Sequence, residues 1–356
     1  MFPTSFYPGP STLYPIVENL LKEVYTNGIL QQNHRSEAFM QLWKQTKKLV
    51  HEKLHVPAEY EIFITSSSTE CWEIINQSLL CDHVQFFYNG AFGKKWFKYA
   101  VTNRTATGFQ THLRGTRFFE NQLIEETEVN PFNQWMCIVQ NETSNGSQIS
   151  ENSIRQLKQK APNALIAIDA TSSLGGQYWD WQVGDVWFSS VQKCLGLPAG
   201  MALLIVSPKA MEWAKKVDER NHYNSLLTIH QNFKKNQTHI TPNVLGIYLL
   251  HGVLQRVDSL DVIDANLKKR ADVLYRFFEN NHQFKPLITN ELTRSQTVIC
   301  LQGSLTDIQE IKKYALENHF VLGNGYGEWK ENTFRIANFP ALDSSSYDSL
   351  IKTLFL

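Results

Sequence analysis

A lysine stands in a short turn between two apolar runs, and this arrangement constrains the fold more than any other feature of the chain. The first run covers 185–189 and the second covers 201–206, while Lys193 lies in the glycine- and proline-containing stretch between them. Short apolar runs bounded by turn residues are typical of buried strands. Because lysine is rarely buried unless it is paired or used chemically, Lys193 is either a solvated turn residue or a reactive amine.

A third apolar run, 165–168, ends in Asp169 and is followed by hydroxyl residues and glycines. If this run and 185–189 are neighbouring parallel strands, Asp169 and Lys193 emerge at the same sheet edge, where ligands bind in open α/β sheets. Asp169 alone could equally be an N-cap or a turn residue. Opposite a lysine that forms a Schiff base, however, an aspartate can keep the ring nitrogen of pyridoxal phosphate protonated. The pair therefore favours the chemical interpretation of both residues.

Several motifs in the right order resemble the class V aminotransferases, a family of pyridoxal-phosphate enzymes with the fold-type I architecture. The motifs are Tyr7-Pro-Gly-Pro-Ser-Thr, Asn141-Glu142-Thr143, Asp169-Ala-Thr-Ser-Ser, Gln192-Lys193-Cys-Leu-Gly-Leu-Pro-Ala-Gly and Phe334-Arg335-Ile-Ala-Asn-Phe. They extend almost from end to end, and the likeness is greatest to the phosphoserine aminotransferase branch. The resemblance implies a transaminase with pyridoxal 5'-phosphate as cofactor and with an amino acid and a 2-oxo acid as substrates.

Short apolar runs alternate with helix-like segments through the first two thirds of the chain. The expected strands are 61–65, 84–88, 135–140, 165–169, 185–189 and 201–206, with helices at 69–80, 93–103 and 151–160. This alternation predicts a largely parallel sheet flanked by helices, in which 201–206 is the antiparallel member. Upstream, residues 1–15 are expected to be loop-like, and helices are expected from Ser11 or Thr12 to Gly28 and over 36–55.

Two further helices, 242–256 and 259–281, are expected to lead into a smaller C-terminal unit. There, strands at 297–302 and 333–337 alternate with helices at 305–318 and 345–355. The predicted fold class is α/β, with a mostly parallel sheet in the large domain and a smaller α+β C-terminal domain. We assign the large cofactor-binding domain to 16–258 and the small domain to 1–15 and 259–356.

Composition argues against several classes of function. The 34 basic and 34 acidic residues balance, so nothing indicates nucleic acid or a membrane surface as a partner. The five cysteines are widely spaced without a zinc-binding pattern, which predicts mostly buried free thiols, no metal site and a cytoplasmic protein. The N-terminus lacks the pattern of a signal peptide, and no apolar stretch is long enough to span a bilayer.

The resemblance implies a set of cofactor-binding residues. Ser68 and Thr69 open a helix after a strand, so they suit the cofactor phosphate, although an ordinary N-cap gives the same pattern. Phe92 stands where relatives place an aromatic residue, typically tryptophan, that stacks on the pyridine ring. The other implied contacts are Thr143 with the ring hydroxyl, Asp169 with the ring nitrogen, Thr171 and Gln192 with the phosphate or its surroundings, and Thr241 with the phosphate of a partner subunit. A homodimer with shared active sites follows from the last of these.

Substrate binding is implied for three residues. Arg335 is expected to hold the α-carboxylate of the amino acid through its planar guanidinium. His34 and Arg35 resemble a pair that receives the side-chain phosphate in phosphoserine aminotransferases. Two departures weaken that specificity: Glu328-Trp329 replaces a His-Arg pair, and serine or threonine replaces the arginine expected at the start of the phosphate-binding helix.

Transamination is the leading prediction, with Lys193 holding the cofactor and moving the proton between the substrate and cofactor carbons. A serine– or alanine–glyoxylate type of aminotransferase remains an alternative, so serine, phosphoserine, alanine and glutamate all remain candidate donors. A class V lyase or desulfurase needs an exposed, mobile cysteine, whereas Cys300 lies in an apparent strand. A cofactor-binding regulator without catalytic activity is a further alternative, but the sequence contains no DNA-binding module or basic patch.

Overall fold

The computed structural model describes residues 3–107 and 112–356, and its larger sheet has seven strands. The strand order is β2-β10-β9-β8-β5-β3-β4. The bounds are β2 (Glu61–Thr65), β3 (His83–Tyr88), β4 (His112–Arg117), β5 (Trp135–Val139), β8 (Leu165–Asp169), β9 (Val186–Ser190) and β10 (Ala202–Val206). Strand β10 is antiparallel to both neighbours, and the other pairings are parallel. The predicted mostly parallel sheet, including its antiparallel strand, is confirmed.

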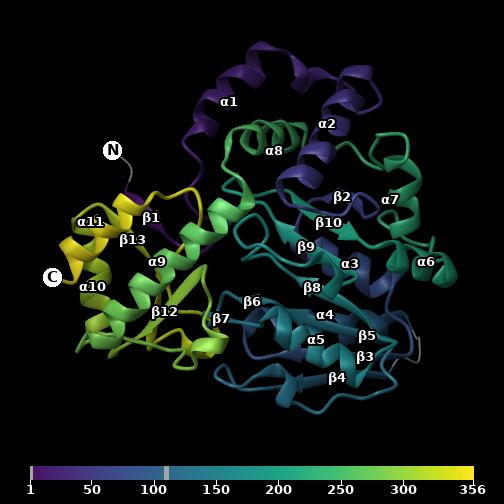
Figure 1. Cartoon of the computed structure of the whole chain (residues 1–356). Coiled ribbons are helices and arrows are strands. Elements are labelled where there is room, and N and C mark those ends of the chain that lie inside the picture. The colour runs from purple at the N-terminus through teal and green to yellow at the C-terminus, as the bar shows by residue number, and fades with distance from the viewer. Residues whose placement is uncertain (1–2, 108–111) are drawn as a thin grey trace.

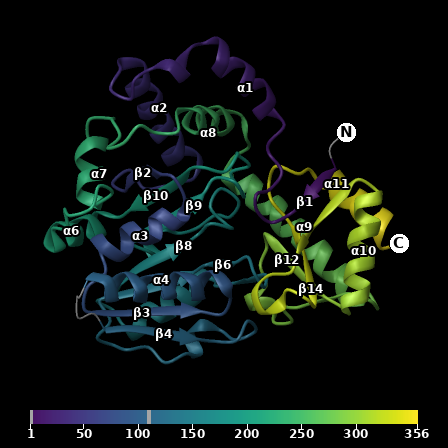
Figure 2. The ribbon, with the colours of Figure 1, turned by 180° about the vertical axis from the view of Figure 1, so that it is seen from behind.

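Helices cover both faces of this sheet (Figures 1 and 2). Every residue of β5, β8 and β9 is buried, as is typical of parallel strands between two helical layers. The surrounding helices are α1 (Ile16–Thr26), α2 (Glu37–Lys53), α3 (Ser68–Ser78), α4 (Ala91–Thr107), α5 (Glu151–Lys160), α6 (Pro208–Val217), α7 (Leu226–Phe233) and α8 (Val244–Arg256). Strands β5, β8 and β9 therefore form the buried centre of the sheet.

A second, five-stranded sheet follows, in the order β1-β13-β14-β12-β11. Its elements are β1 (Thr4–Phe6), α9 (Leu260–Asn280), β11 (Lys285–Pro286), β12 (Val298–Gln302), α10 (Leu305–Glu317), β13 (Phe320–Asn324), β14 (Thr333–Ala337) and α11 (Ser344–Leu354). Both views show α9 running between this sheet and the larger one (Figures 1 and 2). The smaller sheet has its own apolar core, in which Phe6, Phe278 and Phe334 are fully buried.

The N-terminal segment differs from the prediction. It is not a loop throughout, because β1 pairs in parallel with β13 of the smaller sheet. The first helix begins at Ile16 rather than at Ser11 or Thr12. Pro15 disfavours the helical conformation at Tyr14, the residue before it. The segment is instead tied to the turn that carries Lys193, because the backbone N–H groups of Ser11 and Tyr14 donate to the carbonyls of Gln192 and Gly196, each over 3.0 Å.

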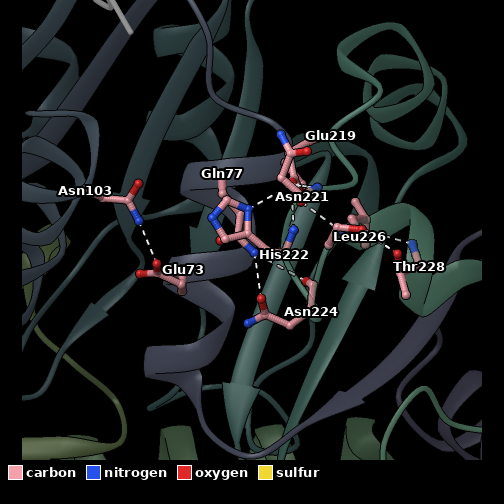
Figure 3. Close-up of polar contacts among 11 residues, drawn as sticks. Glu73, Gln77, Asn103, Glu219, Asn221, His222, Asn224, Leu226 and Thr228 are labelled. Atoms are coloured by element: carbon pink, nitrogen blue, oxygen red, sulfur yellow. Dashed lines mark hydrogen bonds and ion pairs between the residues drawn. The ribbon is translucent and has the colours of Figure 1, made fainter. Parts of the chain in front are cut away.

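The end of α3 far from the sheet edge is fastened by side chains (Figure 3). Gln77 donates to the amide oxygen of Asn224 over 2.8 Å, and Asn103 of α4 donates to Glu73 over 2.6 Å. These contacts fix the middle and the C-terminal end of α3 against α4 and against the segment before α7. No helix within the described ranges is long and apolar enough to cross a membrane.

Candidate active site

A cavity of about 230 Å³ lies at the carboxyl edge of the larger sheet. Nine predicted site residues line it: Ser68, Thr69, Phe92, Thr143, Asp169, Thr171, Gln192, Lys193 and Arg335. They come from the starts of α3 and α4, from the end of β8, from the segments after β5, β8 and β9, and from β14 of the smaller sheet. The other three predicted residues, His34, Arg35 and Thr241, are not among the described residues that line this cavity.

Lys193 is almost completely buried, with 7% of its surface exposed. Its amine donates hydrogen bonds to the hydroxyls of Thr143, over 2.7 Å, and Ser172, over 2.8 Å. Burial lowers the pKa of Lys193 to about 8, although the nearby Asp169 acts in the opposite direction. Much more of this amine is therefore neutral at physiological pH than of an exposed lysine, which is the state that attacks a carbonyl carbon.

Asp169 is the last residue of β8 and has only 4% of its surface exposed. One carboxylate oxygen accepts the backbone N–H of Thr171 over 2.9 Å, and the other accepts the indole N–H of Trp72 over 3.1 Å. Burial raises the pKa of Asp169, whereas the hydrogen bonds from Thr171 and Trp72 and the charge of Lys193 oppose that rise. A cationic N–H group in the cavity would complete the charge pairing of this carboxylate.

Hydroxyl groups gather at the start of α3. The Ser68 hydroxyl is bonded to that of Thr171 over 2.9 Å and to that of Ser190 over 2.8 Å. Nearby, the side-chain oxygen of Gln192 is buried without a partner in the part of the chain that the structure describes. Hydroxyls and an amide beside a helix N-terminus form a neutral but strongly polar site that suits a phosphate group.

Phe92 lies in the first turn of α4, beside the reactive amine. The distance from the Lys193 amine to the centre of the Phe92 ring is 5.4 Å. The ring of Tyr326 stacks on Phe92, with ring centres 5.1 Å apart and an interplanar angle of 11°. A flat aromatic surface thus stands where the resemblance places the ring that stacks on the cofactor.

Arg335 is a buried cation without a carboxylate partner in the described ranges. Only 3% of its surface is exposed, and its Nε and Nη1 groups donate to the carbonyls of Asn324, over 2.6 Å, and Thr143, over 2.8 Å. Burial lowers the pKa of Arg335, which reflects the cost of keeping this charge away from water. The carbonyls fix the guanidinium but leave N–H groups for an anion, and a carboxylate matches their geometry.

The sequence analysis missed Glu142, which orders one corner of the cavity. Its carboxylate accepts the backbone N–H of Gly93 over 3.1 Å, that of Phe92 over 3.4 Å, and the hydroxyl of Ser144 over 2.6 Å. Gly90 is needed beside it, because a Cβ atom there would lie 2.3 Å from the Glu142 side chain. The sequence held one signal, because Glu142 is the charged residue of the Asn141-Glu142-Thr143 motif.

Three residues that bear on substrate specificity or on the type of reaction lie outside the cavity. Glu328 forms an ion pair with Arg117 over 2.8 Å, and Trp329 is buried. Cys300 is buried in β12, and burial raises the pKa of its thiol to about 12. A buried, protonated thiol lacks the exposure and mobility that a desulfurase requires.

Comparisons with known proteins agree with this geometry. The model of the aminotransferase class-V family matches residues 8–325. A phosphoserine aminotransferase from Rhodococcus opacus is 25% identical over 355 residues, which cover 97% of this chain and 92% of that protein. The crystal structure of a phosphoserine aminotransferase from Cytophaga hutchinsonii has a TM-score of 0.91 at 30% identity, over 99% of this chain and 98% of that chain. An alanine–glyoxylate aminotransferase from Nostoc shares the fold, with a TM-score of 0.81 at 19% identity over 99% of this chain and 94% of that chain. The chain belongs to the class V aminotransferase family.

Proposed function

We propose that this protein is a pyridoxal-phosphate-dependent transaminase that moves an amino group between a small amino acid and a 2-oxo acid. The observation that carries the proposal is the enclosure of three groups in one cavity: the amine of Lys193, the carboxylate of Asp169 and the unpaired guanidinium of Arg335. An amine, an acid that stabilises a cationic ring and a cation that binds a carboxylate are the groups that amino-group transfer requires.

The donor set suits pyridoxal 5'-phosphate. Lys193 would hold its aldehyde carbon, Asp169 its ring nitrogen, and Phe92 one face of its ring, while the hydroxyls of Ser68 and Thr171 would hold its phosphate. When bound, the cofactor supplies an electron-accepting ring that stabilises negative charge on the substrate α-carbon. The lysine amine, once free, would take the proton from the substrate α-carbon and deliver it to the cofactor carbon that the amino group has joined, while the hydroxyls of Thr143 and Ser172 hold that amine in place.

We propose a donor with a small, uncharged side chain rather than phosphoserine. The Glu328 carboxylate is occupied by Arg117, and neither residue lines the cavity. Apart from Lys193 and Arg335, Lys95 is the one cation among the described residues that line it. A doubly charged phosphate needs several cationic or N–H donors once it leaves water, and within one subunit the described lining of the cavity supplies only the exposed Lys95 for this purpose.

Replacing Arg335 by glutamine should lower kcat/KM for every amino-acid donor. Each donor needs its α-carboxylate fixed, and losing one partner of a buried charged pair typically costs about 2–5 kcal/mol, or roughly 30- to 4000-fold. The test is steady-state kinetics with alanine, serine, glutamate and phosphoserine. Arg35→Gln serves as the matched control, and it should affect only donors with an anionic side chain. High phosphoserine efficiency that disappears in Arg35→Gln would overturn the proposed donor class.

We also propose a homodimer in which Thr241 acts across the subunit boundary. Thr241 is exposed and lies outside the cavity of its own chain, and the neighbouring Ile240 is 39% exposed. Both ring nitrogens of the adjacent His239 are buried without a partner in the described ranges. These features support a segment that completes its contacts in an assembly with twofold symmetry. The exposed Arg35 could reach a substrate in the same way.

Mixing two inactive variants tests this arrangement. Lys193→Ala lacks the amine, and Thr241→Asp places a negative charge against the phosphate. If Thr241 acts in trans, a hybrid dimer contains one site with both native residues, so unfolding and refolding the mixture should restore up to about one quarter of the activity. The double variant Lys193→Ala/Thr241→Asp, mixed with a single variant, should restore nothing. Full activity of a monomer at assay concentration would rule out shared sites.

Two assignments complete the proposal. We place the large domain at 16–258 and the small domain at 1–15 and 259–356, a division supported by the separate apolar cores of the two sheets. We also place the protein in the cytoplasm, because its five cysteines are free thiols and a reducing compartment keeps them so.

A further inference from the structure

We propose that Tyr326 determines substrate specificity, by forming the wall against which the side chain of the amino acid must fit. This inference rests on the proposed transaminase function and names the class of donor more closely. Tyr326 lines the cavity, follows β13, and belongs to none of the motifs that carry the family resemblance. Its ring limits donors to those with small, uncharged side chains.

Tyr326 lies between two fixed points of the cavity, Phe92 and Arg335. Its ring lies on Phe92, which neighbours the Lys193 amine, and the Arg335 guanidinium lies 5.6 Å from the centre of the Tyr326 ring. An α-amino acid must place its carboxylate at Arg335 and its amino group near Lys193. The substrate side chain is attached to the α-carbon between these two groups. It must therefore pass close to the surface that neighbours both Phe92 and Arg335. That surface is the ring of Tyr326.

The turn that carries Tyr326 is rigid. Tyr326 stands between two glycines: a Cβ atom at Gly325 would lie 2.6 Å from the carbonyl oxygen of Lys330, and Gly327 has a φ angle of +61°. Glu328, which follows Gly327, forms an ion pair with Arg117 of β4. The close packing of the backbone at Gly325 fixes the turn, so a large substrate side chain cannot push the wall aside at low cost.

The wall that Tyr326 forms is apolar and carries no positive charge. An aromatic face offers apolar contact and no cation for a second carboxylate or a phosphate. The nearby Lys95 lies 5.4 Å from the centre of the Tyr99 ring, so its ammonium group already has an attractive partner. The wall thus accepts a methyl or hydroxymethyl group, offers no cation to an acidic side chain, and excludes branched or aromatic groups by contact.

Replacing Tyr326 tests the inference. Tyr326→Ala should raise kcat/KM for leucine and phenylalanine at least tenfold relative to that for alanine, whereas Tyr326→Phe should keep the native preference. Tyr314→Ala on α10 removes a tyrosine of similar exposure, 46% against 41%, outside the cavity, and should change neither value. If Tyr326→Ala is unstable by thermal denaturation, Tyr326→Leu preserves an apolar contact with Phe92 and should give the same direction of change.

A binding experiment separates failure of this inference from failure of the proposed function. Calorimetric titration with acetate, propanoate, 4-methylpentanoate and 3-phenylpropanoate measures the fit of side chains without any turnover. Tyr326→Ala should tighten binding of the two larger acids at least tenfold relative to acetate. If the wild-type protein transaminates no amino acid but Tyr326→Ala still causes this shift in binding, the proposed function is wrong and the assignment of the wall is right. If kcat/KM changes equally for all donors and the dissociation constant changes equally for all acids, or if neither changes, Tyr326 does not select the substrate.

Discussion

Lys193→Ala should abolish transamination, lowering kcat by roughly 10³-fold or more, because one side chain both holds the cofactor and moves the proton. The amine of Lys193 is buried and held by two hydroxyls, whereas Lys95, the other lysine among the described residues that line the cavity, is exposed. Borohydride reduction of the holoenzyme followed by peptide mapping should find the cofactor adduct on the peptide that contains Lys193. An adduct on a different lysine, or none at all, would contradict the assignment.

The pH dependence of cofactor attachment adds a sharper test of the same residue. With its pKa lowered to about 8, the amine is mostly protonated below that pH and mostly neutral above it. The rate of attachment to the apo-protein should therefore rise as pH passes through about 8, whereas an ordinary lysine would show this rise near about 10.4. Lys98→Ala, which removes an exposed lysine from α4, is the matched control and should leave both rate and midpoint unchanged.

The position of Asp169 and Lys193 at one edge of the sheet was predictable because it depends on sheet topology rather than on side-chain detail. Two apolar runs of strand length, with a connection too long for a hairpin, are expected to be parallel neighbours, and the structure pairs β8 with β9 in parallel. Residues that follow such strands must meet at one edge. The motifs then add what topology cannot, namely which of the many polar residues at that edge face the cavity.

Other parts of the site could not be predicted from one sequence. Trp72 binds Asp169 from the second turn of α3, and Ser172 binds Lys193 from the turn after β8, contacts that depend on side-chain directions. The expected roles of Arg35 and Thr241 depend on a partner subunit, and a motif does not tell which subunit its residues serve. Tyr326 lies in a turn between β13 and β14, and only the packing of the smaller sheet against the larger one brings it to Phe92.

Two of the strands that were not predicted, β4 and β1, have a similar explanation. Strand β4, with the sequence His-Leu-Arg-Gly-Thr-Arg, is an edge strand with polar residues on both faces and a glycine, so it lacks an apolar pattern. Strand β1 has only three residues among prolines, and it exists because it pairs with β13 from the far end of the chain. In both cases the pairing partner, rather than local sequence, determines the conformation.

Asp169→Asn should leave the fold intact and reduce turnover by roughly 10³-fold or more, because asparagine cannot hold a protonated ring nitrogen as an anion does. The side chain keeps its size, and at least one of the two N–H donors, from Thr171 and Trp72, retains an oxygen acceptor. The dissociation constant of the cofactor should also increase, which tryptophan fluorescence can follow independently of turnover.

Trp72→Phe separates the charge of Asp169 from its orientation. This variant removes one hydrogen bond to the carboxylate but leaves the negative charge, and a hydrogen bond to a charged group contributes about 1.5–3 kcal/mol. The expected loss in kcat is therefore about 10- to 150-fold at most, smaller than that of Asp169→Asn. Thermal denaturation of both variants checks that the cavity still forms. Near-normal turnover in Asp169→Asn would mean that this carboxylate serves only as a structural acceptor, because a neutral side chain can accept hydrogen bonds but cannot balance a cation.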